Sequence, residues 1–261
     1  MSGRVDVEAL AFSEGLKPAI RRSVAVGQLD AATALARRLG GAVSWSTRDI
    51  DEDGRRSRVM YLGRTQAEAD ALRDAEAEIL PGSTTARPAA HARLGALLGF
   101  PRCCVDAFAG RVERGIDVVV GLGRGLAEDY VAAHDAWTPR AVALVNPLWM
   151  RQRRSLVSFY PCRFDCDAAL EVARGVLGAV ARRDEALADA LVATLTGSIV
   201  VAPDGARVAL VDGVPAPRPG GGGEIDPRDA ELARRLLAGV ATAIAGRPRS
   251  LSPIRVDFAS R

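Results

Sequence analysis

The four cysteines are the residues of this chain whose type and spacing could do chemistry. They fall in two windows, residues 99–104 (GFPRCC) and 160–166 (YPCRFDC), and no other cysteine occurs among the 261 residues. In both windows an aromatic residue and a proline precede the first cysteine, and an alanine-rich apolar stretch follows. Proline is favoured at a helix start, and the helix dipole there stabilises thiolate. We therefore expect all four thiols in the first turns of two helices.

The spacing within each pair decides how the thiols could share a ligand. Cys162 and Cys166 are four residues apart, so on a helix they would share one face. Cys103 and Cys104 are adjacent and would diverge by about 100° within a regular helix. At a first turn, where the backbone changes direction, both could still face one centre.

Four thiolates that meet suit an iron–sulfur cluster or a zinc ion. Neither pair has the C-x-x-C spacing of a zinc knuckle, and a cluster accepts sulfurs from separate corners of a fold. The spacing thus favours an iron–sulfur cluster of the 4Fe–4S type, with zinc as the alternative. The radical-SAM pattern C-x-x-x-C-x-x-C is absent, because Ala169 stands where its third cysteine would follow Cys166.

Two readings without a metal stay open. Cysteine is among the most buried residue types, so the four could be small core residues. Cys162 and Cys166 could also form a reversible disulfide in a thiol redox protein, which would require one exposed, activated thiol. Residues 105–161 separate the pairs, so only tertiary folding could bring them together.

The two windows resemble the paired G-F/Y-P-x-C-C and P-C-x-x-x-C signatures of an uncharacterised prokaryotic family, the domain of unknown function numbered 483. The resemblance covers residues 88–175. It implies that the two windows form one site. It implies no activity, because that family supplies none to carry over.

Three residues near the cysteines are candidates for catalysis. His91 precedes Cys103 by twelve residues and could be an extra ligand or a proton shuttle, or simply a partly exposed helix residue. Asp106 and Asp165 could act as bases or bind metal, although carboxylates in a first helical turn are also favoured by the helix dipole alone.

Arginines near the windows predict an anionic substrate. The guanidinium group matches the geometry of carboxylate and phosphate. The substrate-binding candidates are Arg102, Arg163, Arg153 and Arg154. A run of charges such as 151–154 is also typical of a solvated surface.

Composition is that of an ordinary soluble globular protein, with 48% hydrophobic and 26% charged residues. A net charge of +3 gives little reason to expect nucleic-acid binding, although it does not exclude it. The start of the chain lacks the apolar core of a signal peptide, and residues 191–202 are too short to span a bilayer. We therefore expect a cytoplasmic protein without membrane contact, a setting in which clustered cysteines favour metal binding or catalysis.

Hydrophobic periodicity and turn residues predict a helix-dominated α+β or mixed α/β fold with two β-hairpins and a helical centre carrying the cysteines. The hairpins pair 42–47 with 58–62 and 198–202 with 207–211. Residues 5–40 have short helical patterns, and 155–160 predict a strand that leads into the second window. The main helices are expected at 30–38, 65–80, 89–98, 101–115, 124–137, 168–183, 185–195 and 226–245. An N-terminal α+β segment (1–80) and a cysteine-bearing region (88–261) form either two domains or one.

Together these features predict an iron–sulfur or other metal-dependent enzyme that acts on a small, anionic substrate, with a redox partner if the centre transfers electrons. The first alternative is a non-catalytic module, stabilised by zinc or a cluster, that binds RNA or a protein. The second is a thiol redox protein.

Overall fold

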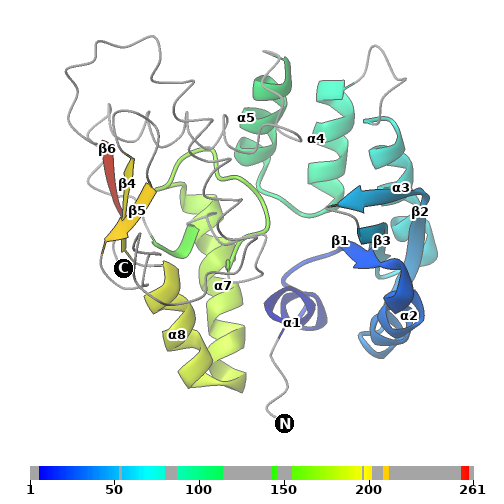
Figure 1. Cartoon of the computed structure of the whole chain (residues 1–261), viewed down its shortest axis with the longest axis horizontal. Helices are drawn as coiled ribbons and strands as arrows, with labels where there is room; N and C mark the ends of the chain where they lie inside the picture. Colours follow the sequence, from blue (N-terminus) through cyan, green and yellow to red (C-terminus); the bar gives the residue numbers. More distant parts are fainter. Residues whose placement is uncertain are drawn as a thin grey trace. The chain divides into compact units, whose positions relative to one another are not determined.

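The computed structural model describes residues 6–52, 55–79, 87–113, 143–145, 155–195, 197–201, 208–211 and 254–258 (Figure 1). Helices predominate among them and two small antiparallel sheets accompany the helices, so the predicted helix-dominated α+β class is confirmed. The chain forms two compact units, residues 1–110 and 111–261. The linker expected at 81–85 lies outside the described residues, and the predicted boundary there stays a prediction.

The first unit is built on a three-stranded antiparallel sheet with the order β1-β3-β2. Strands β2 (Ala42–Glu52) and β3 (Arg55–Gly63) form the first predicted hairpin and are longer than expected. Strand β1 (Ile20–Ala25) pairs with β3, Ile20 lying opposite Leu62. The short helices predicted within 5–40 are present, at Val7–Ser13 and Leu29–Arg38. The sequence did not predict β1, because the partner that makes 20–25 a strand lies about forty residues away in the sequence.

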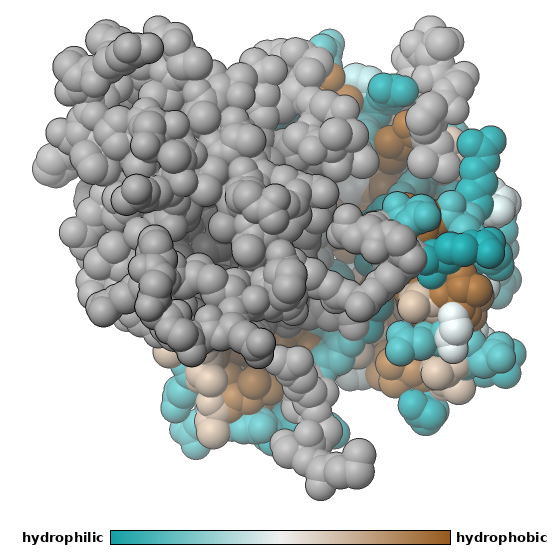
Figure 2. Space-filling view, viewed as in Figure 1, coloured by the Kyte–Doolittle hydropathy of each residue, from teal (hydrophilic) through white to brown (hydrophobic). Residues whose placement is uncertain are grey.

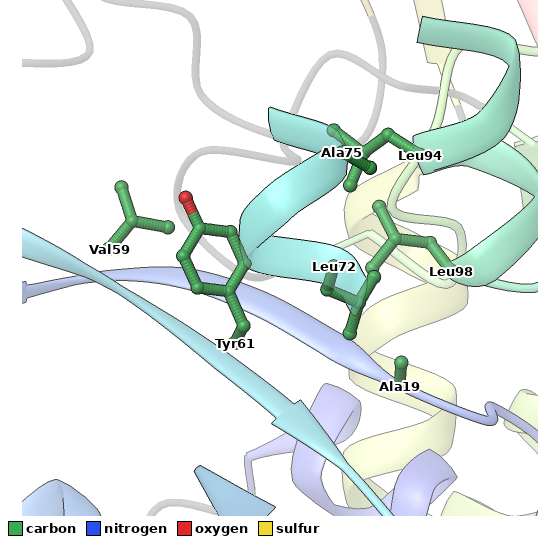
Figure 3. Packing of buried hydrophobic residues seen from close by; sticks show 7 residues of the cluster. All are labelled: Ala19, Val59, Tyr61, Leu72, Ala75, Leu94 and Leu98. Atoms are coloured by element: carbon green, nitrogen blue, oxygen red, sulfur yellow. The ribbon is translucent and has the colours of Figure 1, made fainter. Parts of the chain in front are cut away.

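Helices cover both faces of this sheet (Figure 1). On one face lie α1 (Val7–Ser13) and α2 (Leu29–Arg38), and on the other α3 (Gln66–Ala77) and α4 (Arg87–Leu97). Side chains alternate across a strand, so β3 supplies both cores. Figure 3 shows the core on the α3 and α4 side, formed by Ala19, Val59, Tyr61, Leu72, Ala75, Leu94 and Leu98. The opposite core contains Phe12, Ile20, Val24, Ala36, Met60 and Leu62.

Local signals set the start of α3. The Thr65 hydroxyl accepts a hydrogen bond from the Glu68 N–H at 3.2 Å, and the Glu68 carboxylate accepts one from the Thr65 N–H at 3.0 Å. This is the capping box that the sequence predicted. On the face seen in Figure 2, hydrophilic residues are interspersed with smaller hydrophobic patches over the described part of the chain.

In the second unit, α7 (Asp167–Arg183) and α8 (Glu185–Leu195) pack side by side (Figure 1). Buried Ala169, Ala173, Val176 and Val180 of α7 recur every three or four residues, as an amphipathic helix requires. The Asp184 carboxylate between the helices accepts a hydrogen bond from the Leu187 N–H at 3.0 Å and so caps α8. Both helices were predicted nearly to the residue.

The second sheet has the order β5-β4-β6. Strands β4 (Gly197–Val201) and β5 (Val208–Val211) form the second predicted hairpin, and β6 (Ile254–Phe258) adds a strand that the sequence did not predict. A short 3-10 turn, η2, covers Ala143–Val145. The helices expected at 124–137 and 226–245 lie outside the described residues.

None of the helices in the described ranges is long and apolar enough to cross a membrane.

Candidate metal centre

The first cysteine window begins at a tight corner between α4 and α5 (Arg102–Glu113). Gly99 has a positive φ of 73° and donates its N–H to Ala96 O, while Phe100 donates to Gly95 O, both at 3.0 Å. This pair of hydrogen bonds is the Schellman motif that ends many helices. The predicted corner at Gly99-Phe100-Pro101 is therefore present, and it directs the chain into the cysteine helix.

Close packing holds this corner in place. A Cβ atom on Gly99 would lie 2.5 Å from Pro18 Cδ, so the backbone of the corner rests directly on the Pro18 ring. Lys17, beside Pro18, places its ammonium 5.9 Å from the centroid of the Phe100 ring. Sequence reasoning did not connect Lys17 and Pro18 with the cysteine window, because nothing local links residues that lie about eighty positions apart.

Gly99→Ala is expected to destabilise the first unit more than Gly15→Ala does. Both glycines end a helix with positive φ, so both substitutions incur the left-handed strain of about 1–2 kcal/mol. An added Cβ meets Pro18 at Gly99 but has nothing within 4 Å at Gly15. Urea unfolding of both variants measures the difference. Equal losses of unfolding free energy would show that the Pro18 contact is unimportant.

Cys103 and Cys104 are the second and third residues of α5. The Pro101 carbonyl accepts hydrogen bonds from the N–H groups of Cys104 at 2.9 Å and Val105 at 3.0 Å, so Pro101 immediately precedes the first turn. The first pair therefore lies at a helix start, as predicted. Cys103 is exposed, Cys104 is only 2% exposed, and their Sγ atoms lie 3.9 Å apart.

The second window differs from the prediction. Residues 155–160 form bends rather than a strand, and Cys162 precedes α7 instead of lying within it. Cys166 is the N-cap of α7. Its N–H donates to Arg163 O at 3.2 Å, and its carbonyl accepts from the Leu170 N–H at 2.9 Å. The expectation that Cys162 and Cys166 share a helix face was wrong, because a turn at 163–166 folds the chain back before the helix begins.

The four cysteine sulfurs lie within 4.8 Å of one another. Cys104 and Cys166 are buried, Cys162 is half-buried and Cys103 is exposed, and none is in a disulfide. The four thiols lie close together and could hold a metal ion. The geometric condition for a shared centre, which the sequence left open, is met.

The sulfur separations are compatible with direct ligation of one ion. A tetrahedral ion with metal–sulfur bonds of 2.3 Å places its sulfur ligands about 3.8 Å apart. The Sγ atoms of Cys103 and Cys104 lie 3.9 Å apart, which matches this spacing. No sulfur–sulfur distance among the four cysteines exceeds 4.8 Å, about 1 Å more than the spacing in a tetrahedral site. In a 4Fe–4S cluster each cysteine binds a different iron, so the ligand sulfurs surround a larger body and lie farther apart.

His91 lies on α4, half-buried, with its ring edge against Phe108 of α5 at 5.3 Å between ring centroids. Burial lowers the pKa of His91, and the nearby Glu76 carboxylate only partly offsets this. Among the described residues, the group that could bind one ion consists of the four cysteines and does not include His91. Its role as a proton shuttle stays a prediction.

The charged candidate residues near the cysteines form two ion pairs, Arg102 with Asp106 and Arg163 with Asp165. The Arg102 side chain is 94% exposed, with Nε 3.6 Å from Asp106 Oδ2 one helical turn later. Arg163 Nε lies 3.2 Å from Asp165 Oδ1, an oxygen that is buried and accepts no hydrogen bond. Arg153 and Arg154 lie outside the described residues. The substrate-binding role of the four arginines and the catalytic role of the two aspartates stay predictions.

No protein-family model matches this sequence, and no curated protein or solved structure is significantly similar to it. The resemblance to the domain of unknown function 483 therefore stays a prediction. What identifies the site is the chain's own geometry, four thiols gathered within the reach of one metal ion.

Proposed function

We propose that Cys103, Cys104, Cys162 and Cys166 bind one thiophilic metal ion in a tetrahedral site, and that this ion is zinc. The observation that carries the proposal is the limit of 4.8 Å on the distances between the four sulfurs. Tetrahedral sulfur coordination is typical of zinc and of iron in protein sites. Two helix starts supply three of the four proposed ligands, Cys103 and Cys104 at the start of α5 and Cys166 at the start of α7.

A zinc ion with four thiolate ligands is coordinatively closed, and closed sites of this kind stabilise folds. The function that this geometry supports best is therefore structural, a metal-stabilised and non-catalytic module. That such a module binds a protein or RNA stays a prediction from the sequence. A bound ion would link the two cysteine windows. The backbone hydrogen bonds of Cys166 hold the start of α7, and those accepted by the Pro101 carbonyl hold the start of α5.

An iron–sulfur enzyme is the second candidate, and a specific observation favours it. Neither cysteine pair has the C-x-x-C spacing of zinc knuckles, and two helix starts supply the thiols instead. In this candidate the exposed Arg102 and Arg163 would hold a small anionic substrate beside the cluster. The resemblance to the domain of unknown function 483 is compatible with either candidate.

Metal analysis after anaerobic purification tests the proposal. We expect one zinc per chain, no acid-labile sulfide and no visible absorption band. Replacing zinc with Co²⁺ should then give the visible bands of tetrahedral cobalt with sulfur-to-metal charge transfer. Iron and sulfide in equal amounts, with a broad visible band, would establish an iron–sulfur cluster instead and so favour the second candidate. A metal-free protein of unchanged stability would overturn both candidates and favour the thiol redox or buried-core readings.

A further inference from the structure

The four proposed ligands differ sharply in their access to solvent. Cys104 is 2% exposed and Cys166 is 4% exposed, so reagents in water reach their sulfurs poorly. Cys162 is half-buried, and Cys103 is exposed at the start of α5. The susceptibility of a cysteine to oxidation follows its thiolate character and its exposure. Metal ligation would make all four thiolates, so exposure is what distinguishes Cys103.

We propose that Cys103 is the oxidation site of this centre, where hydrogen peroxide attacks first, and that Cys162 then forms a disulfide with it. The inference rests on the proposed metal centre, because oxidation of two of its four ligands would release the ion. Cys103 is then the residue that is modified, hydrogen peroxide is the oxidant, and release of the ion is the regulated step.

The Sγ atom of Cys104 lies 3.9 Å from that of Cys103, but chain geometry disfavours Cys104 as the disulfide partner. Consecutive Cα atoms are about 3.8 Å apart across a trans peptide. Unstrained disulfides need a Cα–Cα distance of about 4.4–6.8 Å. A disulfide between adjacent residues would also distort the first turn of α5. The favoured partner therefore comes from the second window.

Within the second window the structure favours Cys162 over Cys166. Cys166 is buried, and its backbone is held by the Arg163 carbonyl on one side and the Leu170 N–H on the other. Moving its sulfur would disturb the cap of α7. Cys162 precedes this turn and is half-buried, so its sulfur is easier to reorient toward Cys103.

The reaction balances with peroxide as the only oxidant. The Cys103 thiolate attacks one oxygen of H₂O₂, a sulfur–oxygen bond forms, the oxygen–oxygen bond breaks, and hydroxide leaves. The Cys162 thiolate then attacks the sulfenic sulfur, a disulfide forms, the sulfur–oxygen bond breaks, and a second hydroxide leaves. Two thiolates lose two electrons in total, and H₂O₂ gains them. Only Cys104 and Cys166 remain as ligands, too few for a tetrahedral thiolate site.

The sequence makes the oxidation easy to map. Trypsin cleavage after arginine places Cys103 and Cys104 in peptide 103–111, Cys162 in peptide 155–163 and Cys166 in peptide 164–174. The zinc-loaded full-length protein is treated with peroxide at less than one equivalent, with and without dimedone to trap sulfenic acid. Zinc release is followed with a chromogenic chelator, and tandem mass spectrometry locates adducts and disulfides.

We expect about tenfold more dimedone on Cys103 than on Cys104 or Cys166, because only Cys103 is exposed. Without dimedone, the link between peptides 103–111 and 155–163 should form at the rate at which zinc is released. First oxidation at another cysteine, or a link to peptide 164–174, would overturn the proposal. Cys103→Ser should slow zinc release by peroxide about tenfold. If Cys103→Ser does not bind zinc, the peptide map of the oxidised wild-type protein is sufficient to decide whether Cys103 is oxidised first.

The same experiment separates this inference from the metal centre itself. Zinc content before treatment tests the centre, and the peptide map tests Cys103. Stoichiometric zinc with oxidation elsewhere would refute the oxidation site alone. Absence of any bound metal would refute the centre and, with it, regulation by metal release.

Discussion

Cys166→Ala is expected to weaken metal binding by more than about 100-fold, because loss of even an outer-shell partner costs 10–100-fold in affinity. Cys166 is buried and forms the N-cap of α7, so a water molecule cannot easily take the place of its sulfur as a metal ligand. Binding free energy of a structural zinc contributes directly to folding. The wild-type protein should therefore lose stability when a strong chelator is added, whereas the variant should already be destabilised and insensitive to the chelator. Metal content and urea unfolding with and without chelator measure both effects.

Leu170→Ala is the matched control for Cys166→Ala. Leu170 lies on the next turn of the same helix, is buried, and contributes no sulfur. The cavity left by its side chain should cost about 2–5 kcal/mol of unfolding free energy while stoichiometric metal is retained. If both variants lost their metal equally, the loss would reflect unfolding of α7. If Cys166→Ala kept its metal with unchanged affinity, Cys166 would not be a ligand.

Glu8→Gln is expected to destabilise the protein by about 2–4 kcal/mol, because it leaves two largely buried cations without one of their counter-charges. The Glu8 carboxylate accepts hydrogen bonds from Lys17 Nζ at 2.5 Å and from Arg22 at 3.3 Å. The side chains of Lys17 and Arg22 are only 11% and 10% exposed. Glu14→Gln is the control, since Glu14 is exposed at the end of the same helix, and an ion pair at an exposed carboxylate contributes at most about 1 kcal/mol. It should therefore destabilise the protein less than Glu8→Gln does.

The stabilisation by Glu8 should depend on pH. Burial alone would raise the pKa of Glu8, but Lys17 and Arg22 outweigh burial and lower that pKa below its ordinary value. A carboxyl with a lowered folded-state pKa binds fewer protons when folded, so its contribution is complete above the unfolded-state pKa and is lost as the pH falls through the folded-state pKa. The unfolding free energy should fall less steeply below about pH 4 in Glu8→Gln than in the wild type. Identical slopes would show that Glu8 is not ionically paired in solution.

The elements that the sequence predicted well are those whose signals are local. The capping box at Thr65 and Glu68 fixes the start of α3, and Asp184 marks the junction of α7 and α8. Both hairpins join strands that are close in the sequence, so turn residues and alternating patterns suffice to predict them. The burial of β3 between two layers of helices also explains its nearly continuous apolar run over 59–62.

The elements that the sequence missed depend on distant partners. Strand β1 pairs with β3, and β6 pairs with β4 across more than fifty residues. Residues 155–160 have the apolar, aromatic composition of a strand but form bends. Strand propensity describes a fit to neighbouring strands, so composition alone could not decide this segment.

For the candidate site, the sequence by itself determined which residues are the candidate metal ligands. It singled out all four thiols, placed Cys103 and Cys104 at a helix start behind Gly99 and Pro101, and favoured metal binding from their number and grouping. Only the tertiary structure decided that the sulfurs meet within 4.8 Å, that Cys162 approaches through a turn rather than a helix, and that Cys103 alone is exposed. The physical reason is that closing the chain over residues 105–161 has an entropic cost that the packing of the whole fold must offset, and no local pattern encodes that balance.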